Sequence, residues 1–130
     1  KKADAKKWYV IDGSFMNDLL DTWAIGQKWS VIPLNNKRDD KLQDVWLAGS
    51  SCDSDDIYTG VNGSVTLPDY DMNDGDPMYI AVLDTGAYQD PLAAHHCMLS
   101  SPLKIVAENG HIVVARKRET PDEVGKNFGW

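Results

Sequence analysis

Short runs of β-branched and aromatic residues, each closed by turn-forming residues, recur along this 130-residue chain. Runs of this kind predict strands over Trp8–Ile11, Trp29–Leu34, Asp44–Ala48 and Met78–Leu83. Asp, Gly, Pro and Asn at their ends indicate turns between them. We therefore predict a mainly β fold, a small barrel or compact sandwich with two or three short helices.

The tail of the chain carries a strong local signal. Asn109-Gly110 stands between the apolar runs Leu103–Ala107 and Ile112–Arg116. An Asn-Gly pair in this position is the strongest short-range indication of a β-hairpin.

Two segments have helical patterns. Apolar side chains recur at helical spacing over Phe15–Trp23, and Gly26 follows, so we predict a short amphipathic helix there. Thr120 and Glu123 have the spacing of a capping box with a proline at the first helical position, which predicts a short terminal helix. Loops are expected over Asn35–Asp40 and within Tyr58–Leu67.

Length and charge narrow the functional classes. A chain of 130 residues is long enough for one domain with a modest core, and we expect residues 1–130 to form a single domain. The net charge of −7 disfavours nucleic acid and anionic membranes as partners. No apolar run is long enough to cross a bilayer, and we expect a cytoplasmic location. Most of the tryptophans at positions 8, 23, 29 and 46 are expected in the core.

The stretch Gly49–Asp56 (GSSCDSDD) carries the chemistry that the sequence offers. The predicted strand before it places Cys52 where the chain leaves a sheet and its end groups face a crevice. A thiol there can move a proton, and the carboxylate of Asp53 can hold a cation at a fixed distance from the sulfur. The pattern alone is more typical of a small buried cysteine followed by a solvated turn.

Metal sites are not expected. Asp69–Pro77 departs from a calcium loop, because its glycine falls one place early and no glutamate closes it. His95, His96 and Cys97 are adjacent, so on a helix their side chains diverge, and ordinary packing is favoured over zinc. The two cysteines favour free thiols in a reducing compartment, with a bridge between Cys52 and Cys97 as the alternative.

Tyr88 is a second candidate site residue. Gly86 lets the backbone turn after the strand that ends at Leu83, and this turn presents Tyr88 at the exit of the strand. A phenol there can donate to a phosphate or cap the core.

Three motifs in order resemble one known family. Asp21–Gln27 (DTWAIGQ) followed by Ile32–Leu34, then Cys52–Asp55 (CDSD), then Gly86–Gln89 (GAYQ) are similar to the C-terminal β-domain of the pyridoxal-phosphate-dependent decarboxylases of the alanine-racemase fold. The segment DTWAIGQ and the pairing of CDSD with GAYQ most resemble the arginine decarboxylases. Ornithine decarboxylases tend to carry glycine at the position of Ser54, and diaminopimelate decarboxylases carry glutamate at that of Asp53.

The resemblance implies roles for single residues. Cys52 matches the cysteine that returns a proton to the carbon from which carbon dioxide has left. Asp53 matches the acid that holds the distal cation of the substrate, here a guanidinium, and Tyr88 matches the tyrosine that bonds the phosphate of the cofactor. Asp56 falls on an acidic position that some members use at the subunit contact. The implied activity is decarboxylation of a basic amino acid, arginine to agmatine in polyamine synthesis, with pyridoxal 5'-phosphate as cofactor.

The resemblance also implies that these residues need partners. The lysine that binds the cofactor belongs in this family to an N-terminal barrel domain, so the chain alone is expected to be inactive. The family's site is completed across a homodimer. Ornithine or diaminopimelate decarboxylase, and a catalytically silent homologue acting as a binding or regulatory module, are the alternatives. An unrelated barrel with a ligand groove is another, its groove lined by Trp8, Trp23, Trp29 and Trp46.

Overall fold

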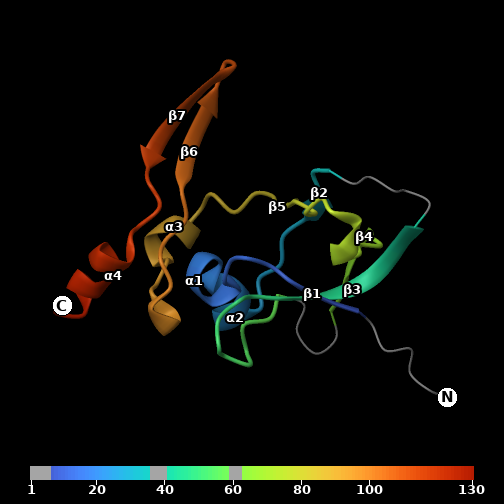
Figure 1. The fold of residues 1–130 in the computed structure, drawn as a ribbon, viewed down its shortest axis with the longest axis horizontal. Coiled ribbons are helices and arrows are strands. Elements are labelled where there is room, and N and C mark those ends of the chain that lie inside the picture. Colours follow the sequence, from blue (N-terminus) through green and yellow to red (C-terminus); the bar gives the residue numbers. More distant parts are fainter. Residues whose placement is uncertain (1–6, 36–40, 59–62) are drawn as a thin grey trace.

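The computed structural model of the chain describes residues 7–35, 41–58 and 63–130 (Figure 1). The described strands are β1 (Lys7–Val10), β2 (Val31–Pro33), β3 (Leu42–Ala48), β4 (Val65–Pro68), β5 (Ile80–Val82), β6 (Lys104–Glu108) and β7 (His111–Arg116). The described α-helices are α1 (Phe15–Asp18), α2 (Leu20–Ile25), α3 (Gln89–Leu92) and α4 (Pro121–Asn127). Two 3₁₀ turns are η2 (Met72–Asp74) and η3 (His96–Met98).

The described strands form three separate sheets. In the first sheet β3 is central, parallel to β1 and antiparallel to β4. The second sheet pairs β2 with β5 and the third pairs β6 with β7, both antiparallel. Strands β2 and β4 are in contact although no hydrogen-bonded ladder joins them, so the first two sheets lie against each other.

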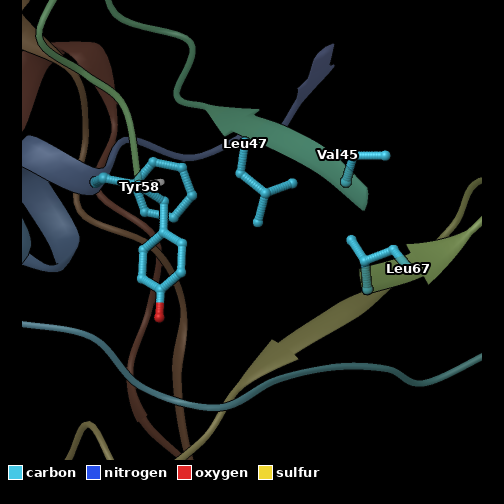
Figure 2. Packing of buried hydrophobic residues seen from close by; sticks show 5 residues of the cluster. Val45, Leu47, Tyr58 and Leu67 are labelled. Carbon is cyan, nitrogen blue, oxygen red and sulfur yellow. The ribbon is translucent and has the colours of Figure 1, made fainter. Parts of the chain in front are cut away.

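Alternation along β3 sets the position of the core. Val45 and Leu47 are fully buried on one face of the strand, as the two-residue period of a strand requires. They form one cluster with Phe15 of α1, Leu67 of β4 and Tyr58. Figure 2 shows the side chains on β3 turned toward the side on which Tyr58 and Leu67 lie. The core therefore sits between α1 and the first sheet, next to the segment that follows β3.

The tryptophans lie outside this core. Trp8 and Trp23 are 47% and 51% exposed, and Trp130 is 79% exposed. Trp46 lies on the face of β3 away from the core and packs edge-on against Trp8, with 4.6 Å between ring centroids. Trp29 packs against the edge of the core. The expectation that most tryptophans are buried is wrong, because the alternation of β1 and β3 turns Trp8 and Trp46 outward together.

The mainly β class is confirmed, with two corrections. The sheets are open, and the described strands do not close into a barrel, because the second and third sheets share no hydrogen-bonded edge with the first. The described residues form four short α-helices where two or three were expected. One reason is that the helix predicted over Phe15–Trp23 breaks at Leu19, whose φ of −135° and ψ of 60° are not helical. Gly26 ends the second piece, as predicted, and its backbone there is in the left-handed conformation.

The predicted hairpin and terminal helix are confirmed. Asn109 and Gly110 both have positive φ, 50° and 79°, which is the backbone of a tight hairpin turn between β6 and β7. Thr120 and Glu123 form the reciprocal capping box at the start of α4. Figure 1 shows the hairpin projecting away from the first two sheets, and nearly all of its side chains are exposed.

Some expected features lie outside the described residues. They are the polar start of the chain before Lys7, the loop over residues 36–40, and residues 59–62 of the irregular stretch. No helix among the described residues is long and apolar enough to span a bilayer.

Candidate functional site

The segment that carries Cys52 and Asp53, residues 49–57, is a loop closed at its base. The backbone N–H of Gly49 donates to the carbonyl of Asp56 at 2.7 Å, and Ala48 and Ile57 form an isolated antiparallel bridge. These contacts join the end of β3 to the residues just before Tyr58. The prediction that Cys52 follows the end of a strand is confirmed.

Asp56 anchors this loop to α1. Its side chain is buried, with one carboxylate oxygen accepting from the backbone N–H of Phe15 at 2.8 Å and of Met16 at 3.3 Å. The other oxygen accepts from the N–H of Ser51 at 3.2 Å. A negative charge at this position also suits the first amides of a helix. The subunit contact expected for Asp56 does not agree with this arrangement, because the carboxylate is enclosed within the chain.

Cys52 is exposed on the same loop, and Asp53 beside it is half-buried. The Cys52 thiol is 3.0 Å from the thiol of Cys97, and both cysteines are free and exposed. One carboxylate oxygen of Asp53 accepts from the N–H of Asp55 at 2.8 Å, and the other is 3.3 Å from Nε2 of His96. Sharing a hydrogen bond with Cys97 raises the pKa of the Cys52 thiol above its usual value. The interpretation of Cys52 as a buried apolar residue is therefore wrong.

Asn17 of α1 holds the segment that carries His96 and Cys97. Its side chain is buried, and its carbonyl oxygen accepts from the N–H of His96 at 2.7 Å while its amide donates to the carbonyl of His96 at 3.1 Å. The backbone carbonyl of Asn17 accepts from the N–H of Ala94 at 3.2 Å. His96 and Cys97 are thus fixed against α1, next to the 49–57 loop. His95 instead faces Glu119, with 2.7 Å between Nε2 and the carboxylate.

Tyr88 starts α3 on the surface. Its φ of 68° is in the left-handed region, its side chain is 74% exposed, and its hydroxyl has no hydrogen-bond partner among the described residues. The next residue, Gln89, is buried and donates to the carboxylate of Asp21 at 2.7 Å while accepting from the N–H of Asp21 at 3.2 Å. This pair joins the GAYQ and DTWAIGQ motifs and fixes the start of α3 against α2.

The helices α1 and α2 therefore serve as a common anchor for the three sequence-predicted residues. The loop with Cys52 and Asp53 is bonded to α1, and the turn with Tyr88 is bonded to α2, with α3 in contact with both helices (Figure 1). The structure brings Cys52 beside Cys97 and Asp53 beside His96. No direct contact joins Tyr88 to Cys52 or Asp53 among the described residues, so their convergence on one substrate stays a prediction.

A cleft of about 250 Å³ lies beside the loop. Its walls include Asn17, Ser50, Asp18 and Arg118, but not Cys52, Asp53 or Tyr88. Burial raises the pKa of the Asp18 carboxyl. No group of three or more His, Cys, Asp or Glu side chains in the described part of the chain is arranged to hold a metal ion.

Sequence reasoning missed the neighbours of the two site residues. The pattern around His96 and Cys97 raises only the question of metal binding, and it does not predict their position beside Asp53 and Cys52. The signal available is weak: the chain has two cysteines, and a bridge between them is only an alternative to free thiols. Asn17, which positions this segment, carries no sequence signal of its role.

The sequence profile described as "Pyridoxal-dependent decarboxylase, C-terminal sheet domain" matches residues 1–86. The chain belongs to the pyridoxal-dependent decarboxylase family. The match includes the CDSD motif and ends at the first residue of GAYQ, so the resemblance seen in the motifs is confirmed at the level of the family.

Relatives in this decarboxylase family include enzymes of two specificities. The chain is 30% identical to arginine decarboxylase 1 of Oryza sativa subsp. japonica over 103 residues, which are 77% of this chain and 15% of that protein. It is 26% identical to diaminopimelate decarboxylase of Aquifex aeolicus over 123 residues, 95% of this chain and 27% of that protein. The chain thus spans less than a third of these relatives.

A solved structure has the same fold. The crystal structure of a diaminopimelate decarboxylase superposes with a TM-score of 0.83 at 21% identity, covering 98% of this chain and 31% of that one. The decarboxylase sheet domain is therefore the fold of the whole chain, the C-terminal hairpin and helix included.

Proposed function

We propose that this chain is the C-terminal domain of a longer pyridoxal-phosphate-dependent decarboxylase that acts on a basic amino acid, with arginine the favoured substrate. In this proposal Cys52 donates a proton, Asp53 binds the distal cation of the substrate, and Tyr88 donates to the phosphate of the cofactor. The observation that carries it is an exposed Cys52 next to a half-buried Asp53, on a loop whose base and buried Asp56 are fixed to the fold.

The proposed proton donor has a suitable protonation state. Because its contact with Cys97 raises the pKa of the Cys52 thiol, the proton stays on the sulfur at neutral pH. Pyridoxal phosphate, when bound, withdraws electrons from the bond to the departing carboxylate. The protein then determines where a proton returns, and an exposed thiol on a loop anchored by Asp56 can deliver it to one face of the substrate carbon.

The proposed cation site has free acceptor capacity. Each oxygen of an ionised carboxylate has two lone pairs, so Asp53 can accept from a substrate while keeping its bond to the N–H of Asp55. A guanidinium can pair with both oxygens at once, which adds geometric selection to charge. His96 is near one oxygen at 3.3 Å, so a bound cation would compete with this imidazole.

Tyr88 fits one part of a cofactor site. Its exposed phenol, without a partner in the described part of the chain, is free to donate one hydrogen bond to a phosphate oxygen. A single donor cannot neutralise a phosphate dianion, so the remaining contacts and the lysine that binds the cofactor are assigned to an N-terminal barrel domain of the longer protein.

Exposed apolar surface supports a larger assembly. Trp8, Trp23 and Trp130 are about half exposed or more, and both faces of the β6–β7 hairpin carry exposed aliphatic side chains. Apolar surface of this extent is typical of residues covered by another domain or subunit. We propose that the N-terminal domain and a second copy of the longer protein cover it, in a cytoplasmic homodimer.

Decarboxylation by the longer protein tests the proposal. Carbon dioxide release is measured separately with arginine, ornithine, lysine and diaminopimelate, and the amine product is identified. The proposal expects arginine to give the highest kcat/KM. Diaminopimelate decarboxylation is the second candidate, favoured by the Aquifex relative. Activity with none of the four, while the protein binds pyridoxal phosphate, would contradict both.

A matched pair of variants tests the role of Cys52. Cys52→Ala is expected to lower kcat roughly a hundredfold, as loss of a general acid does. Cys97→Ala removes the neighbouring thiol and is expected to keep kcat within about a factor of three, because Cys97 does not touch the substrate in this proposal and an ordinary thiol is still protonated at neutral pH. Equal losses in the two variants would remove Cys52 as the specific donor.

A further inference from the structure

The two cysteines of the chain lie in contact although 45 positions separate them in the sequence. Their sulfur atoms are 3.0 Å apart, about 1 Å beyond a disulfide bond of roughly 2.05 Å. Both side chains are exposed, so small oxidants and reductants have access to them. A small movement of two side chains is sufficient to join the sulfurs.

The fold holds the two thiols together from both sides. On one side, Asp56 binds the 49–57 loop to the first amides of α1. On the other, Asn17 of the same helix binds both the N–H and the carbonyl of His96, the residue before Cys97. One helix therefore sets the distance between the thiols.

The backbone at Cys97 is held in an uncommon conformation. Cys97 and Met98 have φ of 58° and 57°, in the left-handed region that residues with a side chain seldom adopt. Such residues persist when surrounding contacts determine them, and they concentrate at functional positions. Here the left-handed turn follows the Asn17 contacts and coincides with the position that brings Cys97 to Cys52.

Neither metal binding nor a purely structural contact accounts well for the paired thiols. A metal site would need three or more ligands, and the described His, Cys, Asp and Glu side chains provide no such group. A structural hydrogen bond between thiols is weak, because sulfur is a poor donor and a poor acceptor. Thiol–disulfide exchange is the remaining chemistry open to two accessible thiols at this distance.

We propose that Cys52 and Cys97 form a reversible intramolecular disulfide by exchange with a low-molecular-weight disulfide such as oxidised glutathione. One thiol loses its proton, and its thiolate attacks the small disulfide, releasing one thiolate and leaving a mixed disulfide. The second thiol then loses its proton and displaces the other half of the small molecule. In total, two cysteine thiols are oxidised, one small disulfide is reduced to two thiols, and atoms and electrons balance.

The bond would remove the proposed proton donor. In the disulfide, Cys52 has no proton to give, so oxidation would stop protonation of the substrate carbon and reduction would restore it. Formation of the disulfide is inferred only from the positions of the two thiols. Its effect on decarboxylation rests on the proposed function. The site thereby becomes a point at which thiol redox state controls the enzyme.

Exchange equilibrium measures the proposed bond in the 130-residue chain. The reduced chain is equilibrated anaerobically with mixtures of oxidised and reduced glutathione, free thiols are blocked with iodoacetamide, and intact mass and non-reduced peptides are analysed. The expected product lacks two hydrogens, contains no glutathione, links the peptides of Cys52 and Cys97, and forms in a proportion independent of protein concentration. Stable glutathione adducts on both cysteines, or disulfide-linked dimers, would overturn the proposal.

Two serine variants serve as controls. Cys97→Ser and Cys52→Ser are each expected to accumulate the single glutathione adduct that the wild type resolves. A melting curve for each reduced protein shows whether it is folded. The oxidised wild type is expected to melt at a higher temperature than its reduced form, because a cross-link constrains the unfolded chain. An equal or lower melting temperature would contradict the inference that the fold already places the two thiols for disulfide formation.

Activity of the longer protein separates the inference from the proposed function. Oxidation is expected to lower decarboxylation roughly a hundredfold in the wild type, reversibly with dithiothreitol. Cys97→Ser is expected to lose activity only in proportion to the glutathione adduct on Cys52, and to keep it under an oxidant that cannot add a group to a single thiol. If the disulfide forms and activity does not change, the proton-donor role of Cys52 fails and the disulfide stands. If peptide analysis finds no link, the disulfide fails whatever the activity.

Discussion

Asp56 and Phe15 are joined by a 2.8 Å hydrogen bond from a backbone N–H of α1 to a buried carboxylate. Asp56 follows Asp53 by three residues, and Phe15 precedes Asn17 by two, so one carboxylate connects the loop of the proposed acid and cation site to the helix that positions Cys97. The stability of the fold and the geometry of the site therefore depend on the same contact.

Replacing Asp56 tests this connection. In Asp56→Asn one oxygen becomes an amide donor, and one of the buried N–H groups of Phe15, Met16 or Ser51 then faces a donor. The cost of such an unsatisfied group predicts a loss of about 2 kcal/mol in the free energy of unfolding, measured by urea denaturation. Asp55→Asn in the same loop removes the same charge from an exposed side chain and should change stability by less than about 0.5 kcal/mol. Equal effects would show that charge, and not the buried contact, is responsible.

Gly49 packs against the carboxylate of Asp56. A Cβ placed on Gly49 would lie 2.3 Å from both oxygens of that carboxylate, so Gly49→Ala has to displace the anchor. We expect a loss of roughly 1–3 kcal/mol, typical of overpacking. Gly86→Ala is the matched control, because a Cβ there meets nothing within 4 Å. Its unfolding midpoint in urea should stay at or slightly above that of the wild type, and a larger loss at Gly86 than at Gly49 would contradict the packing argument.

Local turn and cap chemistry made parts of the fold predictable. The positive φ angles that Asn109 and Gly110 need are specified by those two residues alone. The reciprocal bonds of Thr120 and Glu123 likewise depend on residues three apart. Alternation along β3 correctly indicated a half-buried strand, although it did not show that the large Trp46 faces outward and the smaller Val45 and Leu47 face the core.

The parts of the site that escaped prediction depend on contacts between distant residues. The break at Leu19 separates two helices, one fixed by Asp56 and the other by Gln89. The spacing of apolar residues around Leu19 is that of one continuous helix, so it does not indicate either contact or the break. The approach of Cys97 to Cys52 requires both the Asp56 and the Asn17 contacts, and no local pattern encodes either.

Glu119 gives the fold an acid-sensitive contact. Its carboxylate accepts from the N–H of Ser101 at 2.8 Å and lies 2.7 Å from Nε2 of His95, and these bonds lower the pKa of Glu119 from about 4.5 to about 2. A carboxyl whose pKa is lower in the folded state stabilises the fold above pH 4.5, and this contribution is lost as the pH falls toward 2. Because the carboxylate is partly exposed, we expect a contribution on the order of 1 kcal/mol. Urea unfolding of the wild type and Glu119→Gln between pH 6 and pH 2 measures it: the difference should shrink with acid, and a constant difference would contradict the assignment.

Asp53 is expected to act on substrate binding. In the longer protein, Asp53→Asn keeps the size of the side chain but loses the charge that pairs with the substrate cation, so KM should rise by roughly tenfold to a hundredfold with a smaller change in kcat. Steady-state kinetics with arginine measure both values. Asp44→Asn removes an equal charge from an exposed position on β3 and should leave KM unchanged within about a factor of two. A fall in kcat at unchanged KM would reassign Asp53 to the chemical step.

The chain alone should not bind pyridoxal phosphate at one defined lysine. A stable imine needs an unprotonated amine and a held phosphate, and Tyr88 offers only one donor. Burial lowers the pKa of Lys28, which makes it the first lysine to test in the described part of the chain, but its ammonium donates to the carbonyl of Tyr58 and is not free. After mixing and borohydride reduction, peptide mass spectrometry should find substoichiometric label spread over several lysines. Stoichiometric label at one position, with an absorbance band abolished by borohydride, would show that the domain holds the cofactor unaided; loss of that band in Lys28→Arg would identify the lysine.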